Sequence, residues 1–517
     1  MEAGNATQHS AAVLRNASMS AFQVVVNAGV LVVLYPFLIH TIGREDFGIW
    51  ALVMAWTSAG GLAGLGLSGA AVKFTSKYLA RGERDRVLHV VQTAVLSVGL
   101  LMGIALVCFF PLSSPLLSFL LDTGGALATA KAIIPFAFIS FWLLSLSGVL
   151  TSTIDGCHKM YLRSLIMAGS SVAYLCICFA VVPRFGIRGL VAAQVLQNAG
   201  IFIATWITLR RLLPGLPLIP WQWRRDVFKE MIGYSLNFQA VSIFMLLFEP
   251  VTKSLIARYA GVSMVTPYEA AQRVAIQLRA LIVSAHMAVV PLVAELTERD
   301  PGRIRAVYTK SYHLLIYLTA PLLPFLIGAA PLISRIWLGT YDPFFVRFAD
   351  ILFVGWFLNV LCNPAYFANL GTGDLRWNVR GHFLIALLNV TLGVSLGWFF
   401  GATGVVIGFA CALICGSALI AFSYQREHAI SIRELFSRDS LYLIAAGVAG
   451  MAVMIFGYRR LSDVLDLPWL TVLLLPAYAA FIAAPLWRHS TRYWIYGWLR
   501  EFLTGRLHTA KPATGNA

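Results

Sequence analysis

Three cations stand inside or beside long apolar segments of this sequence. Arg279 and Arg273 belong to one such segment, and Lys253 belongs to the segment before it. A charge at the centre of a membrane-spanning helix costs roughly 2.5–3.5 kcal/mol on insertion scales, so it normally faces a cavity or a partner. A guanidinium matches phosphate oxygens and stays charged, which indicates a site for a phosphate-bearing anion. The alternative is that the two arginines extend to the lipid headgroups.

Lys253 has a carboxylate close by in the sequence. Glu249 and Lys253 are four residues apart and share a helix face, so they can pair. Pro250 lies between them, removes one backbone donor and predicts a kink. The pair is either structural, or it opens when an anion binds Lys253. Glu249 is the only carboxylate that the sequence places deep in a span, and Arg258 is a weaker anion-binding candidate at the outer end of the same helix.

Neutral polar side chains recur at helical spacing in several apolar segments. Gln272, Arg279 and His286 are seven residues apart and form one stripe. Such seams either join neighbouring helices by hydrogen bonds or form the wall of a polar cavity. The candidates for this wall are Asn16, Gln23, Asn27, Gln272, Gln277, His286, Asn359 and Asn363.

Membrane-spanning helices are the elements that would position these residues. The chain has 517 residues, of which 59% are hydrophobic and 12% charged, whereas soluble domains carry roughly 25% charged residues. A helix of about 20 mainly apolar residues crosses the bilayer and satisfies its own backbone. We therefore predict an all-α, polytopic membrane protein with about 14 transmembrane helices. The predicted spans are residues 17–39, 48–70, 88–110, 131–153, 164–182, 189–208, 233–257, 274–294, 312–334, 349–370, 381–399, 403–422, 441–458 and 467–487.

Lys and Arg residues are unevenly distributed between the two sides of these spans. One side holds 27 of the 39 Lys and Arg residues, and basic loops mark the cytoplasmic side of a membrane protein. Both termini are therefore predicted to be cytoplasmic. The net charge of +16 follows from this topology, so nucleic acid is not expected as a partner. Aromatic and basic residues alternate at 491–506 and predict an amphipathic helix in the membrane interface.

The second half of the chain repeats features of the first half. FGIRGLV at Phe185–Val191 matches FGATGVV at Phe400–Val406, and the glycines allow a tight turn between two spans. The basic loops at 80–86 and 298–305 are also similar, but more weakly, and Pro36 and Pro250 occupy corresponding positions in the two halves. Six spans separate the copies, so both have the same orientation, as in the parallel repeats of secondary transporters.

This duplication predicts two parallel-repeat six-helix lobes around a central cavity. The predicted parts are an N-terminal lobe at 1–208, a cytoplasmic linker at 209–232, a C-terminal lobe at 233–425, two additional transmembrane helices at 426–487 and a cytoplasmic tail at 488–517.

Several motifs together resemble one family of membrane proteins. They are YPFLIHTIGREDFGIWALV at Tyr35–Val53, GLAGLGLSGAAVKF at Gly61–Phe74, the ARGERD loop, VVPLVAELTERD at Val289–Asp300, PLISRIWLG at Pro331–Gly339 and the FGATG turn. On these motifs, residues 12–425 resemble the polysaccharide-type flippases of the multidrug/oligosaccharidyl-lipid/polysaccharide (MOP) exporter superfamily, which translocate the repeat units of O-antigen, a part of lipopolysaccharide, and of exopolysaccharide. The resemblance implies two lobes forming a V, alternating access and an undecaprenyl-diphosphate-linked oligosaccharide as cargo.

The resemblance implies that the protein is a bacterial inner-membrane transporter and not an enzyme. Arg279, Arg273 and Lys253 would hold the diphosphate, the polar seams would face the glycan, and the polyprenyl tail would stay among the membrane lipids. Polysaccharide polymerase and chain-length proteins are candidate partners.

Three alternatives are weighed against this interpretation. A cation-coupled multidrug exporter of the same superfamily needs a membrane carboxylate, and Glu249 has a lysine beside it. A lipid II-type peptidoglycan precursor flippase shares the build, but the motifs fit the polysaccharide branch better. A membrane-embedded glycosyltransferase or ligase typically carries a long periplasmic loop, whereas the corresponding loops here are about 20 residues at most.

Motifs for ATP-driven transport and for catalysis are lacking. The sequence contains no G-x-x-x-x-G-K-[ST] and no H-E-x-x-H. Its seven cysteines include no C-x-x-C and mostly lie inside apolar segments, which predicts neither a metal site nor a disulfide framework. We expect no catalytic residue, cofactor or metal. A cleavable signal peptide is also not expected, because the polar N-terminus leads directly into the first span.

Overall fold

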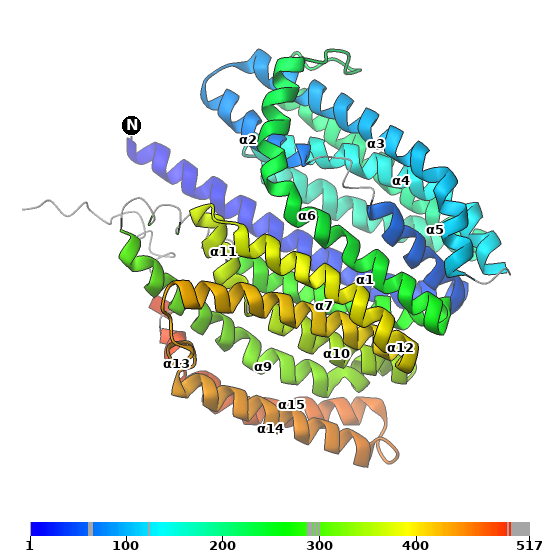
Figure 1. Cartoon of the computed structure of the whole chain (residues 1–517), viewed down its shortest axis with the longest axis vertical. Helices are drawn as coiled ribbons and strands as arrows, with labels where there is room; N and C mark the ends of the chain where they lie inside the picture. Colours follow the sequence, from blue (N-terminus) through cyan, green and yellow to red (C-terminus); the bar gives the residue numbers. More distant parts are fainter. Residues whose placement is uncertain are drawn as a thin grey trace, which may run out of the picture. The chain divides into compact units, whose positions relative to one another are not determined.

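The structure is a computed structural model that describes residues 2–59, 66–121, 125–286 and 300–493, together with positions 293, 296, 496 and 497. The described chain is helical and contains no strand (Figure 1), which confirms the predicted all-α fold. Its helices are α1 (Glu2–Ala59), α2 (Leu67–Ala80), α3 (Arg84–Leu120), α4 (Gly125–Gly156), α5 (Met160–Leu212), α6 (Arg225–Ala260), η2 (Val262–Met264), α7 (Val265–His286), η3 (Pro301–Arg303), α9 (Ile304–Leu338), α10 (Pro343–Val360), α11 (Asn363–Thr372), α12 (Arg376–Glu427), α13 (Ile432–Leu435), α14 (Arg438–Leu461) and α15 (Leu467–Arg488).

Nine helical segments of the described chain are long and apolar enough to cross a membrane. Three of them belong to α1, α5 and α12, and each of these helices is interrupted by one glycine with non-helical torsions. Each interrupted helix therefore corresponds to two predicted spans. Helices α6 and α7 are more polar and fall outside these nine, but they occupy the positions of the seventh and eighth predicted spans. The chain is thus a multi-pass membrane protein.

Helix α7 begins at Val265, well before residue 274, where the sequence analysis placed the start of the eighth span. Gly261 has a φ of 85° and ends α6, so that η2 and α7 follow at once. The hydroxyl of Thr266 donates to the carbonyl oxygen of Arg44 at 2.5 Å and fixes the start of α7 against α1. The predicted start was wrong because the first turns of α7 are polar and do not belong to the apolar run.

Paired glycine breaks support the internal duplication. Gly186 in FGIRG has φ 56° and ψ −138°, and Gly401 in FGATG has φ 59° and ψ −143°. Gly43 and Gly261 form a second matched pair, with φ near 82° and 85°. Only glycine adopts such torsions without strain. Both FG motifs therefore form the predicted tight breaks between consecutive spans.

Two hydrogen bonds repeat the same helix–helix contact in the two halves. Asn198 on α5 donates from Nδ2 to Ser140 Oγ on α4 at 2.8 Å, across 58 residues. Asn359 on α10 donates from Nδ2 to Ser417 Oγ on α12 at 2.7 Å, also across 58 residues. The asparagine and the serine have exchanged places, but each pair joins the fourth and sixth spans of its half.

The chain forms two compact units, one of residues 1–270 and 382–412 and the other of residues 271–381 and 413–517. The core of the first unit lies among α2, α3, α4 and the adjoining ends of α5 and α6. In the second unit, α14 and α15 are the two predicted additional helices, and α14 packs against α9 and α15 (Figure 1). A side chain at Gly447 would meet the Ala320 carbonyl oxygen at 2.7 Å, so glycine permits this close approach. The division into two lobes at 209–232 stays a prediction.

Candidate functional site

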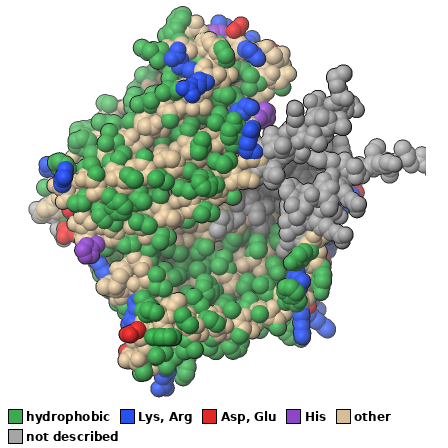
Figure 2. Space-filling view, turned by 180° about the vertical axis from the view of Figure 1, so that it is seen from behind, with side chains coloured by type: hydrophobic (Ala, Val, Ile, Leu, Met, Phe, Trp, Pro, Cys, Tyr) green, Lys and Arg blue, Asp and Glu red, His purple; other side chains and the backbone are tan. Residues whose placement is uncertain are grey.

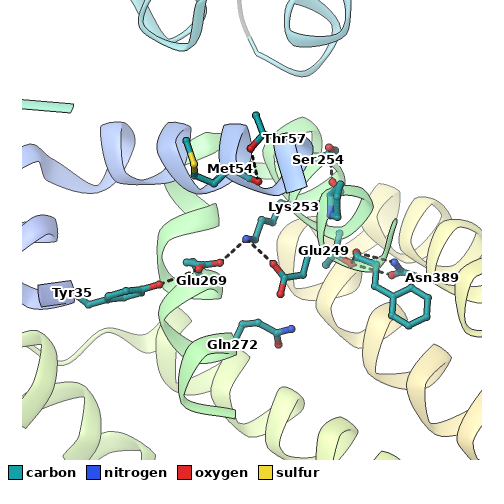
Figure 3. A network of polar contacts seen from close by, with 12 residues as sticks. Tyr35, Met54, Thr57, Glu249, Lys253, Ser254, Glu269, Gln272 and Asn389 are labelled. Carbon is teal, nitrogen blue, oxygen red and sulfur yellow. Dashed lines mark hydrogen bonds and ion pairs between the residues drawn. The ribbon is translucent and has the colours of Figure 1, made fainter. Parts of the chain in front are cut away.

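A buried lysine lies between two carboxylates in the first unit (Figure 3). Lys253 Nζ is 2.7 Å from Glu269 Oε2 and 3.2 Å from Glu249 Oε2. Lys253 and Glu269 are each 1% exposed, whereas the Glu249 side chain is 34% exposed. The hydroxyl of Tyr35 on α1 donates to Glu269 Oε1 at 3.1 Å. The predicted pair of Glu249 and Lys253 is present, but the shorter ion pair of Lys253 is made with Glu269.

These ionisable groups do not balance in charge. When all three are ionised, the two carboxylates exceed the single ammonium by one negative charge. Removing one partner of a buried ion pair leaves an uncompensated charge, which typically costs 3–5 kcal/mol. The partly exposed carboxylate of such a cluster can take up a proton or a small cation. Glu249 is the member through which such a cation would enter, because it alone is partly exposed.

Helix α6 contains a proline, Pro250, close to Lys253. Pro250 has no N–H and therefore breaks one helical hydrogen bond. Asn389 on α12 donates from Nδ2 to the Phe248 carbonyl oxygen at 3.3 Å and accepts from Thr252 Oγ1 at 3.2 Å. Ser254 Oγ donates to the Pro250 carbonyl oxygen at 2.7 Å. Side chains thus satisfy the carbonyl groups around the proline and fix the turn that carries Lys253.

The sequence analysis missed Glu269, a second buried carboxylate beside Lys253. The sequence does contain a signal for Glu269. Glu269 and Arg273 are four residues apart, and Glu269 and Gln272 are three apart. Extending the predicted helix by about one and a half turns before residue 274 therefore places all three on neighbouring positions of one face.

Arg279 lies in a second polar cluster, which belongs to the second unit. Its Nε donates to Asn359 Oδ1 at 3.2 Å, and its guanidinium carbon is 4.9 Å from the centre of the Trp356 ring. Gln272 accepts at Oε1 from Trp356 Nε1 at 2.9 Å. The structure therefore brings together Arg279, Asn359 and Gln272, all predicted from the sequence. The aromatic partner, Trp356, was not predicted.

The partners of Arg279 are neutral. Among the residues that the structure describes, no carboxylate lies within 4.0 Å of its guanidinium. Asn359 in turn donates a hydrogen bond to Ser417. This bond fixes the Asn359 amide, which orients the guanidinium of Arg279. Within the described ranges, Arg279 thus has a positive charge without a carboxylate partner in a half-buried setting, whereas Lys253 has two carboxylate partners. This difference is the main electrostatic distinction between the two clusters.

The other predicted residues of α6, α7 and α11 are placed as follows. Arg273 and Gln277 are half-buried on α7, and Asn363 is buried at the start of α11. His286 is the last residue of α7, and its side chain lies outside the described residues. Arg258 is exposed at the end of α6, and its guanidinium carbon is 5.5 Å from the centre of the Phe119 ring. It also lines a cavity of about 730 Å³ in the first unit.

The polar seam of α1 faces α5. Asn16 Oδ1 accepts from the backbone N–H of Tyr161 at 3.1 Å, and Asn27 Oδ1 accepts from Ser171 Oγ at 2.7 Å. Ser20 and Ser164 are joined at 3.3 Å. The separation in sequence is 144 or 145 residues in all three contacts, so the two helices run parallel and in register. These contacts favour the helix–helix alternative for Asn16 and Asn27, and Gln23 is half-buried between them.

The described part of the chain contains no cluster of metal-binding side chains. No group of three His, Cys, Asp or Glu side chains in the described ranges is placed to hold a metal ion. The predicted amphipathic tail at 491–506 lies largely outside those ranges.

Solved structures with a similar fold are membrane transporters of the MOP superfamily. One is an inward-facing multidrug resistance MATE family transporter, with a TM-score of 0.69 and 14% identity over 80% of this chain and 98% of that chain. Another is the lipid II flippase MurJ in an inward closed conformation, with a TM-score of 0.68 and 13% identity over 90% of this chain and 97% of that chain. A third, a MOP superfamily transporter from Pyrococcus furiosus, has a TM-score of 0.58 and 15% identity over 81% and 96%. At these identities the likeness is one of fold.

The chain therefore shares the fold of these multi-pass membrane proteins. Residues 13–297, more than half of the chain, match the family of polysaccharide biosynthesis proteins, and the chain belongs to this family. No functionally curated protein matches the sequence. The resemblance inferred from the motifs is confirmed at the level of the family, and the fold of the solved structures agrees with it.

Proposed function

We propose that this protein is a flippase of the bacterial inner membrane. Its cargo is a polyprenyl-diphosphate-linked oligosaccharide, which it moves from the cytoplasmic to the periplasmic leaflet for the synthesis of a surface polysaccharide such as O-antigen or exopolysaccharide. Both termini lie in the cytoplasm. The single observation that carries the proposal is the polysaccharide biosynthesis family match over residues 13–297 in a chain with the MOP fold.

Arg279 is the residue that we assign to the diphosphate. Its charge lacks a carboxylate partner among the described residues, and its neighbours Asn359 and Trp356 are neutral. A guanidinium binds phosphate oxygens through two parallel hydrogen bonds and needs no metal. We assign Gln272 and Gln277 on α7 and Asn363 at the start of α11 to contacts with the glycan hydroxyls. Arg273 and Arg258 are secondary anion-binding candidates.

Lys253 has a different role in this proposal. Because Glu269 and Glu249 neutralise it, an anionic cargo would have to displace a carboxylate to bind there. We assign the cluster to holding α1, α6 and α7 together, with opening of the Glu249 contact as the functional step. Polysaccharide polymerase and chain-length proteins would act on the cargo after translocation.

A cation-coupled multidrug exporter is the second candidate function. The observation that favours it is the second buried carboxylate, Glu269, because such a pump exchanges ions at a membrane carboxylate. In this alternative Glu249, the partly exposed carboxylate beside Lys253, holds a cation or a cationic drug.

Deletion of the gene separates the two functions. Lipid-linked sugars and surface polysaccharide are analysed in the deletion strain and in strains complemented with the wild-type or the Arg279→Ala gene. Accumulation of diphosphate-linked repeat units with loss of surface polysaccharide supports the flippase and identifies its glycan. Unchanged polysaccharide with greater sensitivity to cationic drugs supports the exporter. Accumulation of a peptidoglycan precursor instead assigns the cargo to the lipid II class.

A further inference from the structure

An irregular segment between α5 and α6 lies along the first turns of α3. We call this segment, Leu216–Arg224, the strap; it has the sequence LPLIPWQWR and no regular secondary structure. Three backbone N–H groups of the strap donate to buried side chains of α3. Those of Trp221 and Gln222 both donate to Gln92 Oε1 at 3.3 Å, and that of Arg224 donates to Thr93 Oγ1 at 3.2 Å.

Side-chain donors complete the attachment of the strap. Trp223 Nε1 donates to Ser97 Oγ on α3 at 2.9 Å. From α5, Trp206 Nε1 donates to the Leu218 carbonyl oxygen at 2.9 Å, and Arg210 Nε donates to the Leu216 carbonyl oxygen at 3.2 Å. The strap is therefore fixed to two transmembrane helices and does not hang free as a linker.

The strap is fixed beside the first turns of the predicted third span. The predicted span of α3 starts at residue 88, so Gln92 and Ser97 are about 6 Å and about 14 Å along it at 1.5 Å per residue. Irregular backbone at such a depth needs a partner for each polar group. Pro217 and Pro220 have no N–H, and Gln92 and Thr93 serve the N–H groups that follow them. The sequence of the strap thus fits a position at the level of lipid.

The outer surface of the strap combines apolar and cationic side chains. Leu218, Ile219 and Trp221 are each at least 67% exposed. Arg224 and Arg225, where the strap meets α6, are exposed as well, and so are Arg210 and Arg211 at the end of α5. Lys and Arg side chains gather at the end of the molecule where the chain passes from α5 to α6 (Figures 1 and 2). Asp226 is the acidic neighbour, paired with Arg224 at 3.2 Å.

We propose that the strap is a binding site for an anionic phospholipid of the bilayer. The lipid phosphate lies against Arg224 and Arg225, and its acyl chains lie against Leu218 and Ile219, with Trp221 at the boundary between them. Tryptophan favours this interfacial position, and arginine near an anionic leaflet gains electrostatic attraction. The site does not depend on the identity of the transported cargo.

Fluorescence quenching by brominated lipids tests the proposal on the purified full-length protein. The protein is reconstituted in mixed phosphatidylcholine and phosphatidylglycerol vesicles in which one or the other lipid is brominated. The emission of Trp221 and Trp223 is obtained by subtracting the fluorescence emission of the Trp221→Phe/Trp223→Phe variant from that of the wild type. Brominated phosphatidylglycerol is expected to quench this emission several-fold more than brominated phosphatidylcholine at equal fraction.

The Arg224→Gln/Arg225→Gln variant isolates the recognition of charge. Each arginine near an anionic surface contributes about a fivefold preference at low salt, so the variant should lose most of the preference while phosphatidylcholine still quenches. Arg459→Gln/Arg460→Gln, which changes two adjacent exposed arginines at the end of α14, should keep it.

Three outcomes would overturn the proposal. Equal quenching by both lipids in the wild type would make the strap an ordinary interfacial segment. Absence of quenching by either lipid would place the strap away from lipid, as a surface for protein. Complete loss of the preference on addition of trace polyprenyl diphosphate would assign the arginines to the cargo.

Discussion

Lys253 and Glu269 belong to different helices, α6 and α7, yet their charged atoms are 2.7 Å apart and each residue is only 1% exposed. This ion pair closes the turn at Gly261, which separates the two helices. Glu249 and Tyr35 are the other partners of the pair. The contact therefore joins three helices at a point where the bilayer would penalise each charge alone.

Removal of either member of this pair should destabilise the protein. We expect Lys253→Met to cost about 3–5 kcal/mol, because Glu269 then stays buried without its partner. Glu269→Gln should cost less, because Lys253 keeps its ion pair with Glu249. The double variant should cost less than the sum of the two, because neither member of the buried pair then remains. Thermal melting in detergent measures these effects. Additive losses would show that the two side chains are not energetically coupled.

Substitution of Arg279 should affect transport and leave the amount of protein unchanged. Arg279→Ala is expected to lower the export of lipid-linked glycan by tenfold or more, and Arg279→Lys should restore little, because an ammonium does not reproduce the planar guanidinium fork. Arg459→Ala, at an exposed arginine of α14, serves as the control. Surface polysaccharide is measured together with protein level on immunoblots. Normal export by Arg279→Ala would remove this residue from the mechanism.

Asn27 should contribute to helix packing and not to cargo binding. Its Oδ1 accepts from Ser171 Oγ at 2.7 Å, and such interhelical bonds average about 0.6 kcal/mol in membrane proteins. Asn27→Leu should therefore lower the melting temperature slightly and preserve export. A double-mutant cycle with Ser171→Ala measures the coupling. If export instead fell tenfold with unchanged stability, Asn27 would be part of the cavity wall.

Stability should depend on the ionisation of Glu230 at acid pH. Glu230 lies before the predicted seventh span, and burial tends to raise its pKa. Hydrogen bonds from Lys77 Nζ at 2.6 Å and from the Tyr78 hydroxyl at 2.5 Å outweigh burial, and the pKa of Glu230 falls below 4.5.

Between the lowered pKa of Glu230 in the folded chain and its ordinary value of 4.5, the unfolded chain binds more protons than the folded chain. The stabilisation by Glu230 is therefore complete above about pH 4.5 and is lost as the pH falls through the lower folded-state pKa. The difference in melting temperature between the wild type and Glu230→Gln should shrink over this interval. A constant difference from pH 7 to pH 3 would contradict the assignment.

The glycine breaks should be intolerant of a side chain. Gly186→Ala and Gly401→Ala are each expected to cost of the order of 1–3 kcal/mol, because only glycine adopts these torsions without strain. Space is not the cause, since a side chain at Gly186 would meet nothing within 4 Å. Gly200→Ala, at an equally open position inside the regular part of α5, is the control and should be neutral or stabilising. Equal effects at Gly186 and Gly200 would exclude backbone strain.

The sequence by itself determined the class of this protein. Apolar segments of sufficient length must form helices in a bilayer, because no water is available to their backbone groups. The FGIRG and FGATG motifs also predicted their breaks, because glycine at a positive φ is a local requirement that needs no partner. The family followed from such motifs, and the Glu249–Lys253 pair followed from helical spacing alone.

Only the tertiary structure decided which polar groups meet. Tyr35 and Glu269 are 234 residues apart in the sequence, and nothing in the spacing within either helix indicates their contact. For the same reason the sequence left Asn27 between two roles until its bond with Ser171 was visible. Periodicity assigns a side chain to a face of its own helix, but the packing of another helix against that face determines whether its charge is neutralised, as for Lys253, or retained, as for Arg279.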